Sequence, residues 1–104
     1  MTTTETAVLV GGGGREHEIA RALASDPACD LYACASNRNP GIAELADGFE
    51  TVEETAVAAV VEYAVGVGAD IAVIGPEAAL EAGVADALDD AGVYTFGPPS
   101  EAAR

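Results

Sequence analysis

Four consecutive glycines, residues 11–14, separate a short apolar run from the start of a helical pattern. The apolar run is residues 7–10, and Arg15, Glu16 and His17 follow the glycines directly. Because glycine has no side chain, another group can approach the backbone of this turn closely. The N–H groups of the first helical turn face the same space, where the helix dipole favours negative charge. The pattern therefore predicts an anion or phosphate site at the end of the first strand.

Short apolar runs alternate with helical patterns along the whole chain, as in a parallel sheet whose strands are buried on both faces. Strands are expected at residues 7–10, 31–35, 49–52, 71–74 and 93–96, and helices at 15–25, 42–46, 53–66 and 76–91. Strands joined by crossover helices give right-handed connections. We therefore predict an α/β fold, an open Rossmann-like sheet of five parallel strands in the order 3-2-1-4-5 with helices on both faces.

In this order the first and fourth strands are neighbours, and their helices leave on opposite faces of the sheet. Open α/β sheets bind ligands in the crevice at such a switch point. The loops expected to line it are residues 11–17 and 75–80. Glu77 follows Gly75 and Pro76 at the expected helix start. Glu77 is either a helix N-terminal acid, worth about 0.3–1 kcal/mol, or an acceptor for a substrate hydroxyl or amine, and the sequence leaves both interpretations open.

The loops at this edge also carry two cations, Arg15 and Arg38, and arginine binds phosphate bidentately. Compared with the dinucleotide pattern G-x-G-x-x-G, Gly11 and Gly13 fit, but Glu16 stands at the third glycine position. Arg38 suits a 2′-phosphate, so a free-standing NADP-binding Rossmann module is one alternative. A non-catalytic interaction domain with an exposed apolar face is another. A P-loop is excluded because the sequence has no Gly-Lys-Ser/Thr.

The charge of the chain restricts its partners. Eighteen Asp and Glu against four Arg and no Lys give a net charge of −14, which argues against nucleic acid and anionic membranes. The sequence shows neither a transmembrane run nor a signal peptide, so we expect a cytoplasmic protein. The lack of lysine resembles proteins of salt-loving microbes. Such a halophilic protein with an acidic surface should lose stability at low salt, where its charges repel unscreened.

No residue is expected to carry out acid–base or covalent chemistry. His17 is the single histidine, and no nucleophile or base–orienter pair accompanies it, so we expect a positioning role. Cys29 and Cys34 lack CxxC spacing and have no histidine cluster near them, so no metal site is expected. Both cysteines are expected to be reduced and structural.

Four motifs along the chain are similar to the serial motifs of the phosphoribosylamine–glycine ligase family, also called glycinamide ribonucleotide synthetase. They occupy residues 11–17, 39–41, 74–80 and 96–98. The family pattern reads G-N-G-G-R-E-H, N-A-G, V-G-P-E-x-P-L and F-G-P. Gly12, Pro40 and Ala79 depart from that pattern, which affects local loop geometry.

The resemblance covers residues 1–104 and implies a single N-terminal, pre-ATP-grasp domain, with the ATP-grasp and C-terminal domains of the family absent from this chain. In the family reaction, ATP phosphorylates the carboxylate of glycine, and the amine of 5-phosphoribosylamine attacks the glycyl phosphate. The product, glycinamide ribonucleotide, belongs to purine biosynthesis.

The resemblance further implies that ATP and Mg²⁺ (or Mn²⁺) bind the ATP-grasp domain, which packs against this one. The chain alone is then expected to be inactive and to have no catalytic residue. Its partners would be 5-phosphoribosylamine, glycine and the ATP-grasp domain. The substrate-binding residues implied are Gly11, Gly13, Gly14, Arg15, Glu16, His17, Asn39, Gly41, Gly75, Pro76 and Glu77.

Overall fold

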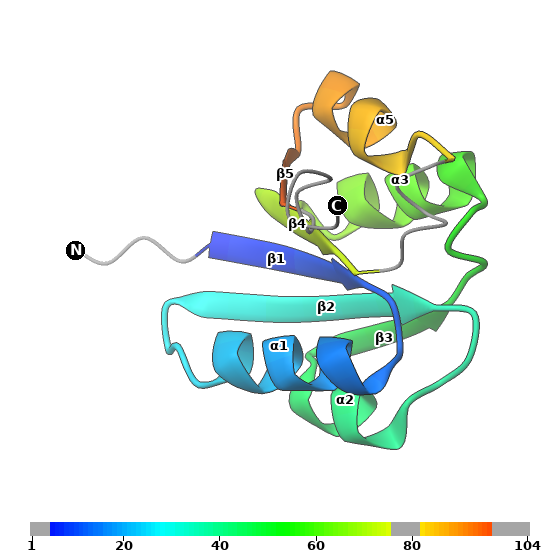
Figure 1. Ribbon diagram of the computed structural model, residues 1–104. Coiled ribbons are helices and arrows are strands. Elements are labelled where there is room, and N and C mark those ends of the chain that lie inside the picture. The colour runs from blue at the N-terminus through cyan, green and yellow to red at the C-terminus, as the bar shows by residue number, and fades with distance from the viewer. Residues whose placement is uncertain (1–4, 76–81, 97–104) are drawn as a thin grey trace, which may run out of the picture.

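The strands form a single parallel sheet in the order β3-β2-β1-β4-β5, as predicted (Figure 1). The structure is a computed structural model that describes residues 5–75 and 82–96. The strands are β1 (Glu5–Val10), β2 (Cys29–Ala35), β3 (Gly48–Thr51), β4 (Ile71–Ile74) and β5 (Tyr94–Phe96). The helices are α1 (Gly14–Ala24), α2 (Pro40–Leu45), α3 (Val57–Gly66) and α5 (Val84–Asp90).

Strand β1 is the centre of the sheet, and its residues 7–10 have no exposed surface. It pairs with β2 on one side, where Val8 lies opposite Tyr32. On the other side it pairs with β4, where Val8 lies opposite Ala72. Side chains alternate across a strand, and both faces of β1 are covered, so the whole apolar run is buried. This explains why the strand reads as a continuous hydrophobic segment rather than an alternating one.

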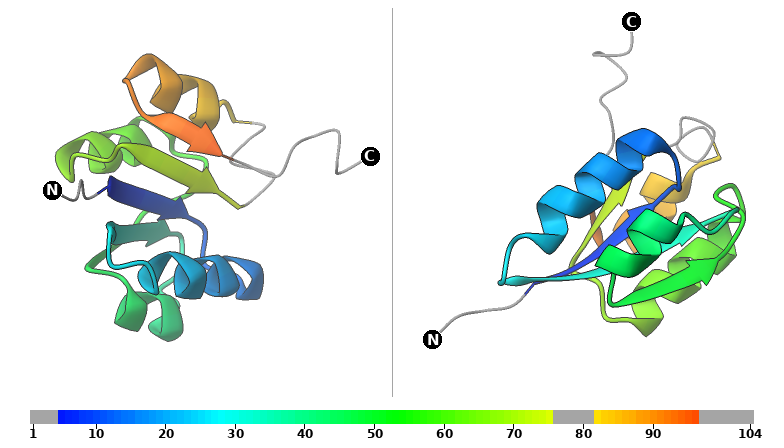
Figure 2. Two further views of the ribbon diagram at one scale, coloured as in Figure 1. Left: turned by 90° about the vertical axis from the view of Figure 1, so that its left-hand side faces the viewer. Right: turned by 90° about the horizontal axis from the view of Figure 1, so that it is seen from below.

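Two apolar cores lie on opposite faces of the sheet. On one face, Val60 of α3 and Leu88 of α5 belong to the same buried cluster as Val8. On the other face, Ala20 of α1 and Ile42 of α2 are buried with Leu9 and its neighbours. The views in Figure 2 show these helix pairs on the two sides of the sheet. The helices that follow β1 and β4 therefore leave on opposite faces, and the predicted switch point is confirmed.

Helix α3 begins at Val57, four residues later than the expected start of the helix at 53. The Glu54 carboxylate accepts hydrogen bonds from Ser36 N at 2.9 Å and Ser36 Oγ at 3.2 Å. These bonds hold the segment before α3 against the loop that follows β2. The periodic apolar pattern could not reveal this, because the partner lies in another loop.

The helix expected at residues 76–91 also differs in its start. Helix α5 begins at Val84, and its N-cap residue, Gly83, has φ +90°. A left-handed residue cannot continue a right-handed helix, so no single helix runs through residue 83. Residues 76–81 lie outside the described part of the chain. Within the described residues, none of the helices is long and apolar enough to cross a membrane.

Candidate functional site

The glycine loop begins where β1 ends. Gly11 N donates a hydrogen bond to Cys34 O at 2.9 Å, and Gly11 has φ +126°. This backbone conformation is strained for any residue with a side chain, so the turn out of the sheet requires glycine there. Gly13 is the N-cap residue of α1, and its carbonyl accepts a hydrogen bond from His17 N at 3.0 Å. The predicted order of strand, glycine turn and helix is confirmed.

The end of β4 lies against the glycine loop. Arg15 Nη2 donates a hydrogen bond to Gly75 O at 2.8 Å, and Gly75 N donates one to Val10 O at 3.0 Å. The structure thus brings Arg15 and Gly75 together at the carboxyl edge of the sheet, on neighbouring strands. Pro76 and Glu77, which the sequence placed beside them, lie outside the described residues.

Glu16 is a buried carboxylate in the middle of this junction, with 7% of its surface exposed. Its Oε1 accepts a hydrogen bond from Gly13 N at 2.8 Å, and its Oε2 lies 3.6 Å from Arg15 Nε. A Cβ at Gly75 would overlap this carboxylate. Glu16 therefore holds the loop from within, as the acid of a capping box does at a helix N-terminus.

Arg15 is held at one edge of its guanidinium group. Nε faces Glu16 and Nη2 bonds Gly75 O, while the side chain is 65% exposed. Nη1 has no hydrogen-bond partner within the described part of the chain. The backbone N–H groups of Gly14 and Arg15 lie in the first turn of α1, where no intrahelical acceptor is available. These donors form an exposed corner that could bind an anion.

Asn39 attaches a third loop to the same edge. Its Nδ2 donates a hydrogen bond to Gly12 O at 2.9 Å. Its Oδ1 accepts hydrogen bonds from Gly41 N at 2.9 Å and from Ile42 N at 3.2 Å, so Asn39 is also the N-cap residue of α2. The loop between β2 and α2 and the glycine loop are therefore joined by one side chain.

His17 packs against Gly41 where α1 approaches α2. A Cβ at Gly41 would lie 2.6 Å from His17 Nε2, so the imidazole occupies the space that a side chain at residue 41 would need. Gly41 is required for this close approach, and the ring of His17 supports the start of α2. The positioning role expected for the histidine stays a prediction.

Arg38, the second cation of the predicted edge, lies over the ring of Phe49 in β3 at 5.8 Å from its centroid.

The geometry of the glycine loop bears on the dinucleotide alternative, because Glu16 already accepts the hydrogen bond of Gly13 N. In the dinucleotide fingerprint the glycine loop is instead open to the pyrophosphate. The position of Glu16 therefore disfavours a diphosphate at this loop.

Within the described residues, neither the buried cysteine nor a cluster of metal-ligating side chains points to a catalytic site. Burial raises the pKa of Cys34 to about 12, so its thiol stays protonated and is a poor nucleophile at neutral pH. No three His, Cys, Asp or Glu residues of ranges 5–75 and 82–96 are grouped so that they could hold a metal ion. The described residues therefore do not fit a metal, and we derive no chemical step through one.

The sequence identified most of the residues at this edge but missed how they act. It did not reveal that Glu16 is buried against Gly75, or that Glu54 holds Ser36. One signal was present, because Glu16 follows Gly13 at the spacing of a capping box. The contact between residues 16 and 75 joins distant segments and required the fold.

The fold and the site define a Rossmann-like α/β domain with a glycine loop at its topological switch point. The model of the phosphoribosylglycinamide synthetase N domain matches residues 5–104. The chain belongs to this family.

Curated relatives are phosphoribosylamine–glycine ligases. The Pyrococcus furiosus protein is 50% identical over 97 residues, and the Thermococcus gammatolerans protein is 48% identical over 97 residues. Both alignments cover 93% of this chain but only 22% of the relative. A solved structure from Mycobacterium tuberculosis, titled as glycinamide-RNase-transformylase T, matches 88% of this chain and 28% of its own, with a TM-score of 0.72 and 20% identity. That likeness concerns the fold alone.

Proposed function

We propose that this chain is the N-terminal domain of a phosphoribosylamine–glycine ligase, which joins glycine to 5-phosphoribosylamine in purine biosynthesis. Its relatives carry that name, and the chain spans about a fifth of their length, 22%. The observation that carries the proposal is the bond from Arg15 to Gly75 O, which joins the glycine loop to the end of β4. The domain supplies one wall of the substrate site and packs against an ATP-grasp domain.

The substrate group assigned to this domain is the phosphate of the pentose. A phosphate accepts hydrogen bonds from Gly14 N, Arg15 N and Arg15 Nη1, the donors for which residues 5–75 and 82–96 offer no acceptor. The loops around this phosphate are shaped by Gly11, Gly13, His17 and Gly41. Pro76 and Glu77, which follow Gly75 in the sequence, are assigned to the substrate site as well, with Glu77 as an acceptor for a hydroxyl or amine of the substrate.

ATP and Mg²⁺ (or Mn²⁺) are assigned to the ATP-grasp part of the ligase, beyond this domain. The chain by itself is then unable to form the glycyl phosphate. An assay of ATP turnover with glycine and 5-phosphoribosylamine is expected to show no activity for residues 1–104. Appreciable turnover would refute this assignment of the reaction to other domains.

Titration with ribose 5-phosphate, a stable phosphorylated pentose, tests the phosphate site. Arg15→Lys keeps the charge but loses the planar fork, so it cannot serve Gly75 O and a phosphate together. We expect its dissociation constant by calorimetry to rise about tenfold, the effect of one lost charge-assisted hydrogen bond. Arg21→Lys is the matched control, because Arg21 is exposed on the same helix and, among the described residues, its side chain pairs only with Glu18, at 3.8 Å. If both variants bound ribose 5-phosphate equally more weakly than the native chain, the proposed phosphate site at Arg15 would be contradicted.

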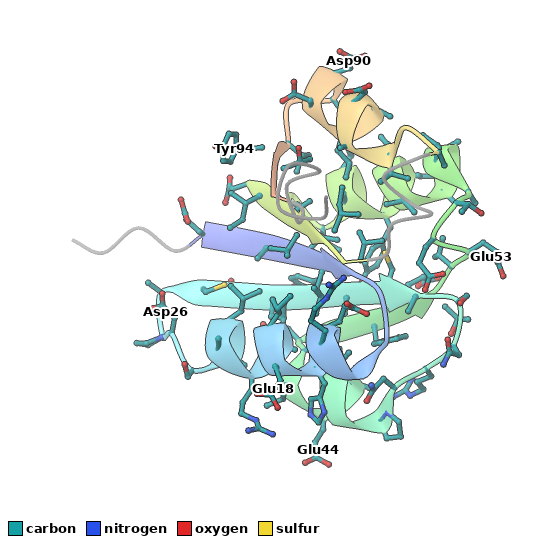
Figure 3. The ribbon with its side chains drawn as sticks, in the orientation of Figure 1. Glu18, Asp26, Glu44, Glu53, Asp90 and Tyr94 are labelled. Carbon is teal, nitrogen blue, oxygen red and sulfur yellow. The ribbon has the colours of Figure 1, made fainter. Side chains whose placement is uncertain are left out.

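The cellular setting is proposed to be the cytoplasm of a salt-loving organism. The labelled carboxylates of Glu18, Asp26, Glu44, Glu53 and Asp90 lie at the periphery of the molecule (Figure 3). They belong to different elements, so the acidic character is spread over the surface. A surface of this kind is compatible with concentrated salt, which screens repulsion between like charges.

A further inference from the structure

The peptide unit between Gly12 and Gly13 is held at both of its polar ends. Its carbonyl, Gly12 O, accepts a hydrogen bond from Asn39 Nδ2 at 2.9 Å. Its N–H, from Gly13, donates to Glu16 Oε1 at 2.8 Å. A peptide unit is planar, with its C=O and N–H pointing in opposite directions. Two side chains on opposite sides of the loop therefore fix the orientation of this plane.

We call these two hydrogen bonds, from Asn39 and to Glu16, the clamp of the Gly12–Gly13 peptide. The clamp matters because the loop is a run of glycines. A glycine run can rotate its peptide planes at little steric cost, and the next two N–H groups, those of Gly14 and Arg15, follow directly from this plane. We propose that Asn39 is a positioning residue that, with Glu16, locks the Gly12–Gly13 peptide and so aims the phosphate-binding N–H groups. This inference rests on the proposed phosphate site and assigns Asn39 to holding the loop rather than to touching the substrate.

The chemistry of the asparagine side chain fits this task. Its oxygen caps α2 by accepting from Gly41 N and Ile42 N, while its NH₂ group holds the glycine loop. Aspartate and serine cap helices nearly as well as asparagine. Aspartate, however, has no donor for Gly12 O, and the hydroxyl of serine is held on a shorter side chain. Substitution at residue 39 can therefore separate the cap from the clamp.

The test compares Asn39→Ser and Asn39→Asp with the native chain. Amide hydrogen exchange should speed up at Gly13 by about fivefold in both variants, the effect of one lost neutral hydrogen bond. Exchange at Ala43, whose N–H bonds Asn39 O in the first turn of α2, should stay unchanged because the cap is kept. The neutral variant Asn39→Ser should also bind ribose 5-phosphate about fivefold more weakly.

Asn37→Ser is the matched control, since Asn37 lies in the same loop and is exposed, and within the described part of the chain its side chain bonds only Ser36 Oγ, at 3.4 Å. It should change neither exchange at Gly13 nor binding. If the amide of Gly13 exchanged in Asn39→Ser at the same rate as in the native chain, the proposal that Asn39 holds the loop would be refuted. If the native chain fails to bind ribose 5-phosphate, the proposed function fails, while exchange at Gly13 still decides whether Asn39 holds the loop.

Discussion

Single residues at the carboxyl edge act mainly on one another. Glu16 illustrates this, because its carboxylate contacts Gly13 N and approaches Arg15 Nε, and it fills the space beside Gly75. The sequence predicted each of these residues to be part of a ligand site, and that assignment stays a prediction. Only the structure shows that Glu16 serves the loop, since it is buried against Gly75, a residue distant in the chain.

Gly75→Ala tests the packing of this junction. A Cβ at Gly75 would overlap the Glu16 carboxylate, and the buried acid has little room to move. We expect the free energy of unfolding to fall by about 1–3 kcal/mol, the usual cost of overpacking. Thermal or urea unfolding measures the change.

Gly14→Ala is the control for this prediction. A Cβ at Gly14 would meet nothing within 4 Å, and alanine favours the helix that begins there. Its stability should equal or exceed that of the native chain. A Gly75→Ala variant as stable as Gly14→Ala would show that Glu16 does not occupy the space assigned to it.

At the scale of elements, the strands were predictable because they are continuous apolar runs buried on both faces. The strand order followed from the alternation of strands and helices. The starts of the helices were harder to predict from the sequence. Helix α3 starts at Val57, after Glu54 has bonded Ser36 of another loop, and no single helix runs through Gly83, whose backbone is left-handed. Both features are tertiary or conformational and leave little mark on hydrophobic periodicity.

Helix α3 has an N-cap residue without a capping side chain, Ala56. Ala56→Ser supplies an oxygen for the unpaired N–H groups of the first turn, and serine adds no charge to an acidic protein. We expect the free energy of unfolding to rise by about 0.5–1 kcal/mol. The melting temperature measures this gain.

The same substitution at Ala58, an exposed residue inside the first turn of α3, is the control. Serine is a poorer helix former than alanine there, so Ala58→Ser should lower stability by a few tenths of a kcal/mol or leave it unchanged. Equal effects at residues 56 and 58 would contradict the capping argument.

At the scale of the whole molecule, the net charge of −14 opposes the compact state. Potassium chloride shortens the screening length from about 10 Å at 0.1 M to about 3 Å at 1 M. We therefore expect the melting temperature to rise by several degrees over this range. A chloride salt suits the test, because sulfate stabilises proteins in general. A melting temperature that stays flat or falls with salt would contradict the proposed halophilic adaptation.

We propose that the glycine loop and the end of β4 form one phosphate-binding edge. The most direct measurement is an NMR titration of the isotope-labelled chain with ribose 5-phosphate, following backbone amides and the arginine Nε–H groups. We predict that the largest shifts fall on Gly14, Arg15 and Gly75, including Arg15 Nε–H. Shifts confined to the opposite edge of the sheet, or centred on Arg38 and β3, would contradict it.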